Sequence, residues 1–215
     1  MIEEKKDFGG DSVTKERFLL VSSFIYLAVV NSPLLLAKLP QDSLLGAISY
    51  VAISIIGMSI LIFVFVRYNG ENDSIMQVKK IIRWFVGGII VSFILQFFYI
   101  NALLLFSHKA YEASSTLAAL QQIKSAEFMI IASAICIPII EEIVFRYSLP
   151  TVLEKRLSWQ FSLIISAMLF ALLHGNNLIF YLLLGLWFGY LYHRTKQIWV
   201  PISVHVVMNL WILFR

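Results

Sequence analysis

The sequence predicts an all-α protein, a single bundle of helices that cross a membrane. The first observation is composition, because 60% of the residues are hydrophobic, only 14% are charged and the mean hydropathy is +0.83. Soluble globular domains carry far more charge. The second is the length of the apolar runs, since each can cross a hydrocarbon core of about 30 Å. We expect about seven spans (six to eight), near 18–37, 44–66, 84–106, 127–146, 159–174, 177–192 and 198–214.

The orientation of these spans follows from the positions of Lys and Arg, which cytoplasmic loops retain in excess. Residues 1–17 mix both signs of charge and lack the apolar core of a secretory signal, so we expect a cytoplasmic tail. With the N-terminus inside, 13 of the 17 Lys and Arg residues are cytoplasmic. The four exceptions are Lys38, Lys109, Lys124 and Arg215.

Residues 18–215 read as one transmembrane domain, because the chain shows no flexible linker and no internal repeat. The polar connections 67–83 and 107–126 are expected to form helices that lie on the membrane surface. The net charge of +4 is explained by basic loops beside anionic lipid headgroups, so no nucleic-acid partner is expected. The single cysteine, Cys136, is expected to pack as a small hydrophobic residue.

Ionisable side chains gather in the second half of the chain. In the first three spans the polar residues Asn31, Gln96 and Asn101 are typical of kinks and interhelical contacts. An ionisable group inside a membrane is costly, so several of them should converge on a protected interior. The later spans contain Glu141, Glu142, Arg146, His174, His205 and Asn209.

Helical spacing groups these residues further. Glu142 and Arg146 are four residues apart and share a helix face, which predicts an ion pair, while Glu141 is rotated away from that pair and stays available. The same spacing puts Phe170 with His174, and His205 with Asn209, on shared faces. In each pair the two side chains are one turn apart.

Depth in the membrane decides whether these groups can meet. If the fourth helix continues past Pro150 to about Glu154, Glu141 lies about 20 Å from its cytoplasmic end at a 1.5 Å rise per residue. His174 then lies at about 24 Å, and His205 and Asn209 at about 12 and 18 Å. All four can share one layer.

A carboxylate, two imidazoles and a carboxamide in a water-restricted pocket are suited to hydrolysis of an amide. The carboxylate and one histidine can remove a proton from water, and the other histidine with the asparagine can donate hydrogen bonds to a developing oxyanion. A serine or cysteine nucleophile is not required.

The segments EEIVFR, FALLH and HVVMN resemble, in order, the motifs EExxxR, FxxxH and HxxxN of the CAAX protease and bacteriocin-processing family (CPBP, also called Abi). This family contains the type II CAAX prenyl endopeptidases. The resemblance covers about residues 127–213, the expected catalytic core. One residue departs from the pattern, since Tyr147 follows the arginine where many members carry glycine.

The resemblance implies an intramembrane endopeptidase of the plasma membrane of a bacterium. Glu141 and His174 would activate water, and His205 and Asn209 would bind the oxyanion. Glu142, Arg146 and Phe170 would support the site. The zinc signature HExxH is absent, so a mechanism without cofactor or metal is favoured over a zinc ion held by Glu141, His174 and His205.

The expected partners are the lipid bilayer and a peptide or membrane-protein substrate, in bacteriocin self-immunity or peptide processing. One alternative is a non-catalytic immunity protein that binds a bacteriocin or its receptor. Another is a transporter that uses intramembrane carboxylates as proton relays, although the chain lacks the duplicated halves of many transporters. The intact motif set favours catalysis.

Overall fold

The computed structural model describes residues 12–32, 44–69, 78–107, 129–174 and 177–214, and all regular structure within these ranges is helical. The all-α prediction is therefore confirmed for the described part of the chain. The helices are α1 (Ser12–Val30), α3 (Leu44–Asn69), α4 (Val78–Ser107), η1 (Ile131–Cys136), α6 (Ile137–Glu142), η2 (Ile143–Ser148), α7 (Leu149–Leu153), α8 (Trp159–Leu173), α9 (Leu178–Thr195) and α10 (Trp199–Phe214).

Each predicted apolar run contains most of one helix, with two differences at the boundaries. The first helix begins at Ser12, inside the segment expected to be a tail, and the fourth run continues as helix to Leu153, as the depth argument required. The surface helices predicted within 67–83 and 107–126 fall largely on residues 70–77 and 108–128, outside the described residues.

Two described helices are long and apolar enough to cross a membrane, judged by length and composition alone. They cover Leu44–Arg67 in α3 and Val78–Ala102 in α4. The helices Trp159–Leu173 and Trp199–Leu213 are apolar but shorter. Seven spans and a cytoplasmic N-terminus therefore stay predictions.

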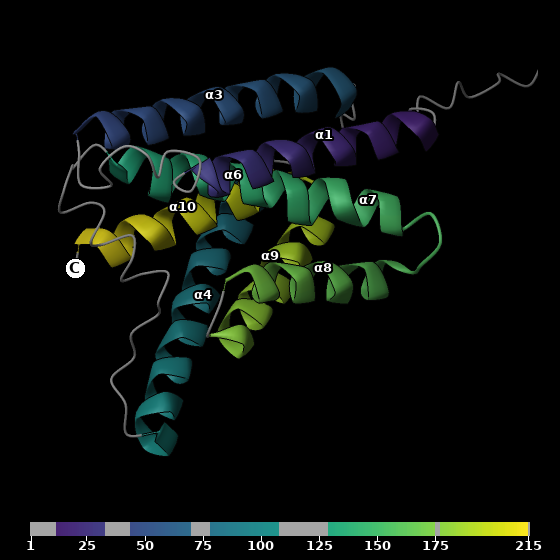
Figure 1. Ribbon diagram of the computed structural model, residues 1–215. Helices are drawn as coiled ribbons and strands as arrows, with labels where there is room; N and C mark the ends of the chain where they lie inside the picture. The colour runs from purple at the N-terminus through teal and green to yellow at the C-terminus, as the bar shows by residue number, and fades with distance from the viewer. Residues whose placement is uncertain (1–11, 33–43, 70–77, 108–128, 175–176, 215) are drawn as a thin grey trace, which may run out of the picture.

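The helices form two packed groups around the segment from η1 to α7. Figure 1 shows α1 and α3 side by side along this segment, and both helices pack against α6. On the other side, α4 crosses at a steep angle and packs against α9 and α10, while α8 packs along α9. The segment that carries the two glutamates is thus enclosed by helices from both halves of the chain.

The helix with the two glutamates changes its hydrogen-bond register on both sides of them. In η1 the N–H of Ile137 donates to the carbonyl of Ala132, and in η2 the N–H of Leu149 donates to that of Val144. Both bonds span five residues, the π-helical spacing, which is frequent at functional sites. In η2 the Ser166 hydroxyl of α8 donates to the Phe145 carbonyl, so a neighbouring helix is bonded to this altered turn.

Small residues allow α8 and α9 to approach closely. A Cβ atom on Gly185 would lie 3.1 Å from the Ala167 Cα atom, and one on Gly189 would lie 2.2 Å from a Leu163 methyl carbon. The two glycines are four residues apart, the spacing that brings membrane helices together. This packing fixes α8, and with it the position of His174.

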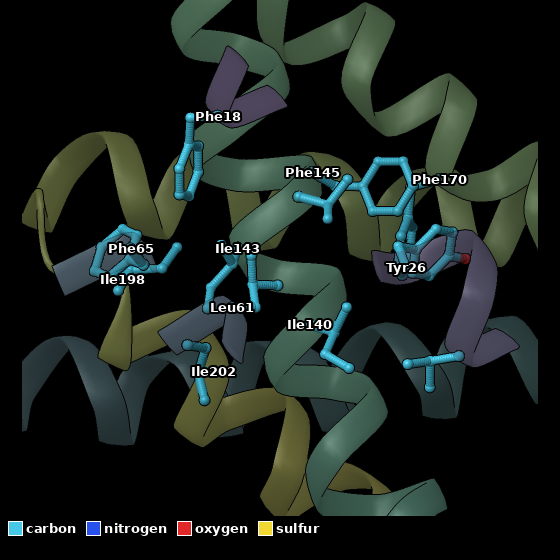
Figure 2. Close-up of a cluster of buried hydrophobic side chains, with 12 residues drawn as sticks. Phe18, Tyr26, Leu61, Phe65, Ile140, Ile143, Phe145, Phe170, Ile198 and Ile202 are labelled. Atoms are coloured by element: carbon cyan, nitrogen blue, oxygen red, sulfur yellow. The ribbon is translucent and has the colours of Figure 1, made fainter. Parts of the chain in front are cut away.

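The largest hydrophobic cluster joins α1, α3, α6, η2, α8 and α10 around the two glutamates. Figure 2 shows Phe145, Phe170 and Tyr26 near one another in this cluster, and Phe65, Ile198 and Phe18 in another part of it. Ring centroids are 5.4 Å apart for Tyr26 and Phe145 and 5.5 Å apart for Phe145 and Phe170. The aromatic part of this cluster therefore includes the turn that follows the two glutamates.

Candidate active site

Glu142 lies at the centre of a fully buried ionic network. Its carboxylate accepts a hydrogen bond from Arg146 Nε at 3.0 Å and a longer one from Nη2 at 3.4 Å, so the predicted ion pair is present. The same carboxylate lies 2.9 Å from His205 Nδ1 on α10. A carboxylate has about four acceptor positions, so it can hold both partners at once.

Arg146 is held by aromatic rings as well as by Glu142. Its guanidinium carbon lies 4.4 Å from the centroid of the Phe170 ring and 5.9 Å from that of Phe188. These contacts attract a cation to ring faces in a medium where water is excluded. Arg146 Nη1 has no hydrogen-bond partner among the described residues. The guanidinium group is therefore held by the two aromatic rings and the Glu142 carboxylate.

Glu141 takes no part in these hydrogen bonds and lies between two imidazole rings. Its Oε1 atom is 3.6 Å from His174 Nε2, and its Oε2 atom is 3.9 Å from His205 Nε2. Both distances exceed a direct hydrogen bond. Although only 5% exposed, Glu141 makes no hydrogen bond to any described residue. The two adjacent glutamates thus differ in their hydrogen bonds. Glu142 bonds Arg146 and His205, whereas Glu141 bonds no described residue.

The partners of the two Nδ1 atoms assign the histidine tautomers. His174 Nδ1 lies 2.7 Å from the Phe170 carbonyl oxygen, which can only accept, so Nδ1 carries a proton. His205 Nδ1 faces the Glu142 carboxylate and is likewise the donor. In the neutral form of each ring, Nε2 is therefore a free acceptor pointed toward Glu141.

The two rings differ in what lies behind them. His174 is backed by a neutral carbonyl group, whereas His205 is backed by a carboxylate. The two rings therefore face Glu141 with different hydrogen-bond partners behind them.

The remaining predicted residues differ in how closely the structure associates them with Glu141. Phe170 is buried, with its ring 4.2 Å from the His174 ring, its carbonyl on His174 Nδ1 and its face on Arg146. Asn209 is half-buried on α10, one turn beyond His205, and makes no hydrogen bond to a described residue. Its role in binding an oxyanion stays a prediction.

Sequence reasoning missed the bond between Glu142 and His205 and two aromatic contacts. Tyr181 packs 4.3 Å from the His174 ring, and Phe188 packs 5.1 Å from the His205 ring, both on α9. The sequence carries no signal for these two aromatic residues, because their spacing matches ordinary packing. The sequence predicts Glu142 only as the ion-pair partner of Arg146. Its bond to His205 was not predicted.

Among the described residues, no group of three or more His, Cys, Asp or Glu side chains has the arrangement to hold a metal ion. The donor set considered for zinc, Glu141 with His174 and His205, has the chemical type of a zinc site but not this arrangement. Whether activity requires a metal ion is tested by measuring it after treatment with a chelator.

Comparisons with known proteins cover the segment that builds this site. Residues 124–211 match the model of the type II CAAX prenyl endopeptidase Rce1-like family. The chain is also 33% identical over 153 residues to the "Putative membrane peptidase YdiL" of Bacillus subtilis (strain 168). That alignment covers 67% of this chain and 59% of the relative. Both matches support the CPBP family, which contains the type II CAAX prenyl endopeptidases. No solved structure matches it at a significant level.

The CPBP motifs account for all the polar residues of the site, and the one departure from the motif has a packing role. Tyr147 lies edge-on to Phe18 on α1 and Phe65 on α3, with ring centroids 5.5 and 4.8 Å apart. Where many CPBP members carry a glycine, this chain joins η2 to two neighbouring helices through aromatic rings. Tyr147 therefore packs against the hydrophobic core.

Proposed function

We propose that this CPBP protein is an intramembrane endopeptidase of the bacterial plasma membrane, with its N-terminus in the cytoplasm, in which Glu141 activates water to hydrolyse a peptide bond. The observation that carries the proposal is the position of Glu141. It is a buried carboxylate without a hydrogen-bond partner among the described residues, placed between the Nε2 atoms of two histidines.

Membrane insertion is supported by the surface as well as by the composition. Large apolar side chains are exposed along most helices, including Leu20 and Phe24 on α1, Phe63 on α3 and Phe98 on α4. In water such a surface would aggregate, whereas in lipid it is solvated. The relative named as a membrane peptidase and the match to prenyl endopeptidases agree with this location.

Water activation follows from the separation between Glu141 and His174. At 3.6 Å the two groups are too far apart for a direct bond and close enough to share one water molecule. That water donates one hydrogen bond to Glu141 Oε1 and one to the free acceptor His174 Nε2. When the water oxygen attacks the peptide carbonyl carbon, Glu141 removes a proton, and the buried site strengthens this transfer because bulk water is excluded.

The tetrahedral intermediate needs donors for its oxyanion. His205 would supply one from Nε2 when that nitrogen carries a proton, and the Glu142 carboxylate, 2.9 Å from Nδ1, holds the ring in position. Asn209, one turn further along α10, supplies a second donor from its carboxamide. The proton held by Glu141 then passes to the leaving amine as the carbon–nitrogen bond breaks, which returns the carboxylate to its starting form.

The substrate class is a peptide or membrane protein cut at or near the bilayer, with peptide processing or bacteriocin self-immunity as the physiological setting. The competing function is an immunity protein that binds a toxin or its receptor without catalysis. A binder has no need for an unpaired glutamate between two oriented histidines, so the site favours hydrolysis. The two functions give different results when a histidine is removed.

The test uses the protein reconstituted in liposomes and a library of internally quenched peptides, with products identified by mass spectrometry. Wild type should cleave at least one peptide and incorporate heavy oxygen from labelled water into the new carboxyl group. His174→Ala and His205→Ala should each lower the rate by about 100-fold or more, because each removes a proton-transfer or oxyanion group.

The matched control is His193→Ala, at the far end of α9, where the imidazole stacks on Trp159 with ring centroids 4.0 Å apart. This variant should keep the wild-type rate. Retained cleavage in His174→Ala or His205→Ala would contradict the mechanism, whereas protection from a toxin that survives both changes would support the binding function. The same assay after dialysis against a strong chelator tests metal dependence, since a loss that zinc restores would replace the metal-free mechanism.

A further inference from the structure

Of the two histidines that face Glu141, His174 is the one that lies at a helix end. The last residue of α8 is Leu173, and His174 follows it with φ −97° and ψ 6°, outside the helical region. His205, by contrast, lies within α10. The 3.6 Å from His174 Nε2 to Glu141 Oε1 is too long for a direct hydrogen bond, so the carboxylate does not fix the imidazole. The orientation of the His174 ring therefore depends on the groups that pack around it.

Two aromatic rings and one hydrogen bond hold the His174 imidazole. Its Nδ1 atom donates to the Phe170 carbonyl oxygen at 2.7 Å. The centroids of the Phe170 and Tyr181 rings lie 4.2 and 4.3 Å from that of the imidazole, with interplanar angles of 43° and 32°. The Phe170 and Tyr181 centroids are 6.3 Å apart, so the two rings contact the imidazole from different directions. The hydrogen bond alone lets the imidazole swing about it, whereas the two ring contacts restrict that motion.

Tyr181 is itself supported by contacts between the start of α9 and α4. Asn177 directly precedes α9, and its Oδ1 atom accepts a hydrogen bond from the Tyr99 hydroxyl of α4 at 3.3 Å. Phe180 is buried and stacks on the Tyr99 ring, with centroids 5.0 Å apart. Tyr181 packs against the hydrophobic cluster that contains Phe170 and against a second cluster that contains Phe180. The ring beside His174 is thus held by helices other than α8.

We propose that Tyr181 is a positioning residue, whose ring keeps the His174 imidazole turned so that Nε2 faces Glu141. The inference rests on the proposed endopeptidase function and adds a residue of α9 to the site. Placement matters because a displacement of about 1 Å at a reacting group can lower the rate by about 100-fold. Loss of the Tyr181 ring should therefore lower kcat and leave peptide binding nearly unchanged. A residue that only fills the core would affect stability without a selective effect on His174.

The kinetic test uses a peptide that the wild-type protein cleaves. Tyr181→Leu fills much of the same space without a flat ring, so it should lower kcat by about 10- to 100-fold and leave KM within about twofold. Tyr181→Phe keeps the ring and should restore kcat to near the wild-type value. Tyr190→Leu is the control, because Tyr190 lies further along α9 and packs on Trp84 and Trp187. A wild-type kcat in Tyr181→Leu, or an increase confined to KM, would overturn the inference.

A second test observes the His174 ring directly and does not depend on activity. The protein is labelled with a heavy nitrogen isotope in its histidine rings, and NMR in liposomes distinguishes protonated from unprotonated ring nitrogens. The signals absent from His174→Ala identify His174. Wild type and Tyr181→Phe should carry the proton on Nδ1, as the bond to the Phe170 carbonyl requires. Tyr181→Leu should lose this single tautomer, because the freed ring leaves that carbonyl.

These measurements separate the role of Tyr181 from folding and from the proposed function. An unchanged His174 tautomer in a folded Tyr181→Leu protein would overturn the inference, even with slower cleavage. If Tyr181→Leu does not fold, Tyr181→Met takes its place, because methionine adapts to irregular gaps. Loss of folded protein in both variants would assign Tyr181 to the core and also overturn the inference. A wild-type protein that cleaves no peptide would instead refute the endopeptidase function, while the NMR result still decides whether Tyr181 positions His174.

Discussion

The helices before residue 124 and those after it are similarly apolar, yet they satisfy their buried polar side chains in different ways. In the earlier helices, serine and asparagine side chains bond backbone carbonyls of their own helix, and Ser22 bonds Ser148 Oγ on η2 as well. Ser32, Ser54 and Ser92 donate to carbonyls three or four residues back, as do Asn31 and Asn101. Such bonds hold a polar group without requiring a partner helix.

The later helices contain serines of the same kind, but their ionisable side chains bond across helices. Glu142 pairs with Arg146 one turn further along its own helix and also with His205 on α10, and Glu141 faces the rings of His174 and His205 from other helices. In the described helices before residue 124, Lys, Arg and Glu lie near helix ends. The contrast shows where a candidate active site can be sought in this chain. It lies where buried polar side chains take hydrogen-bond partners from other helices.

The largest expected effect on stability comes from breaking the cross-helix network. Arg146→Ala should lower the free energy of unfolding by about 3–5 kcal/mol, because it leaves Glu142 charged, buried and without its cation. The measurement is the folded yield and the thermal unfolding midpoint in detergent. Arg156→Ala, an exposed arginine after α7, is the control and should change neither. A well-folded but inactive Arg146→Ala protein would show that Arg146 acts in the chemistry instead.

A smaller effect is expected where two helices of the later half meet. Gly185→Val should cost about 1–3 kcal/mol, because the added carbon atoms meet the Ala167 backbone of α8. Gly87→Val on α4 is the matched change in the earlier half, since a Cβ there meets nothing within 4 Å. Equal unfolding midpoints for the two variants would contradict the close packing of α8 and α9.

The smallest effects separate the two kinds of buried serine. Ser92→Ala removes a bond within α4 and should cost less than about 1 kcal/mol. Ser166→Ala removes the bond from α8 to the Phe145 carbonyl on η2 and should cost about 1–2 kcal/mol, because that carbonyl stays buried without a partner. Unfolding midpoints measured side by side test the ranking, and a larger loss for Ser92→Ala would reverse the comparison.

Much of this arrangement could be predicted from the sequence. Long apolar runs identify helices because length and hydropathy are local properties, and the four-residue spacing of Glu142 and Arg146 predicts their ion pair. The convergence of Glu141, His174 and His205 followed from the cost of isolated charges in a membrane together with a continuous helix to about Glu154. These inferences need only helical geometry and depth.

The rest depends on how the helices are rotated and packed, which spacing alone does not determine. The π-helical segments on both sides of the glutamates leave no mark in the hydropathy pattern. The bond between Glu142 and His205 spans 63 residues, and nothing in either local pattern indicates it.

The central claim is that Glu141 activates water, whereas the adjacent Glu142 holds Arg146 and His205 in place. A pair of isosteric variants tests this claim most directly. Peptide cleavage and the thermal unfolding midpoint are measured for Glu141→Gln and Glu142→Gln in the same liposome preparation. Glu141→Gln should keep the wild-type midpoint and lose cleavage by about 1,000-fold, because an amide cannot accept the proton from water. Glu142→Gln should lower the midpoint, because Arg146 and His205 lose their shared carboxylate. Wild-type cleavage by a folded Glu141→Gln protein would contradict the account.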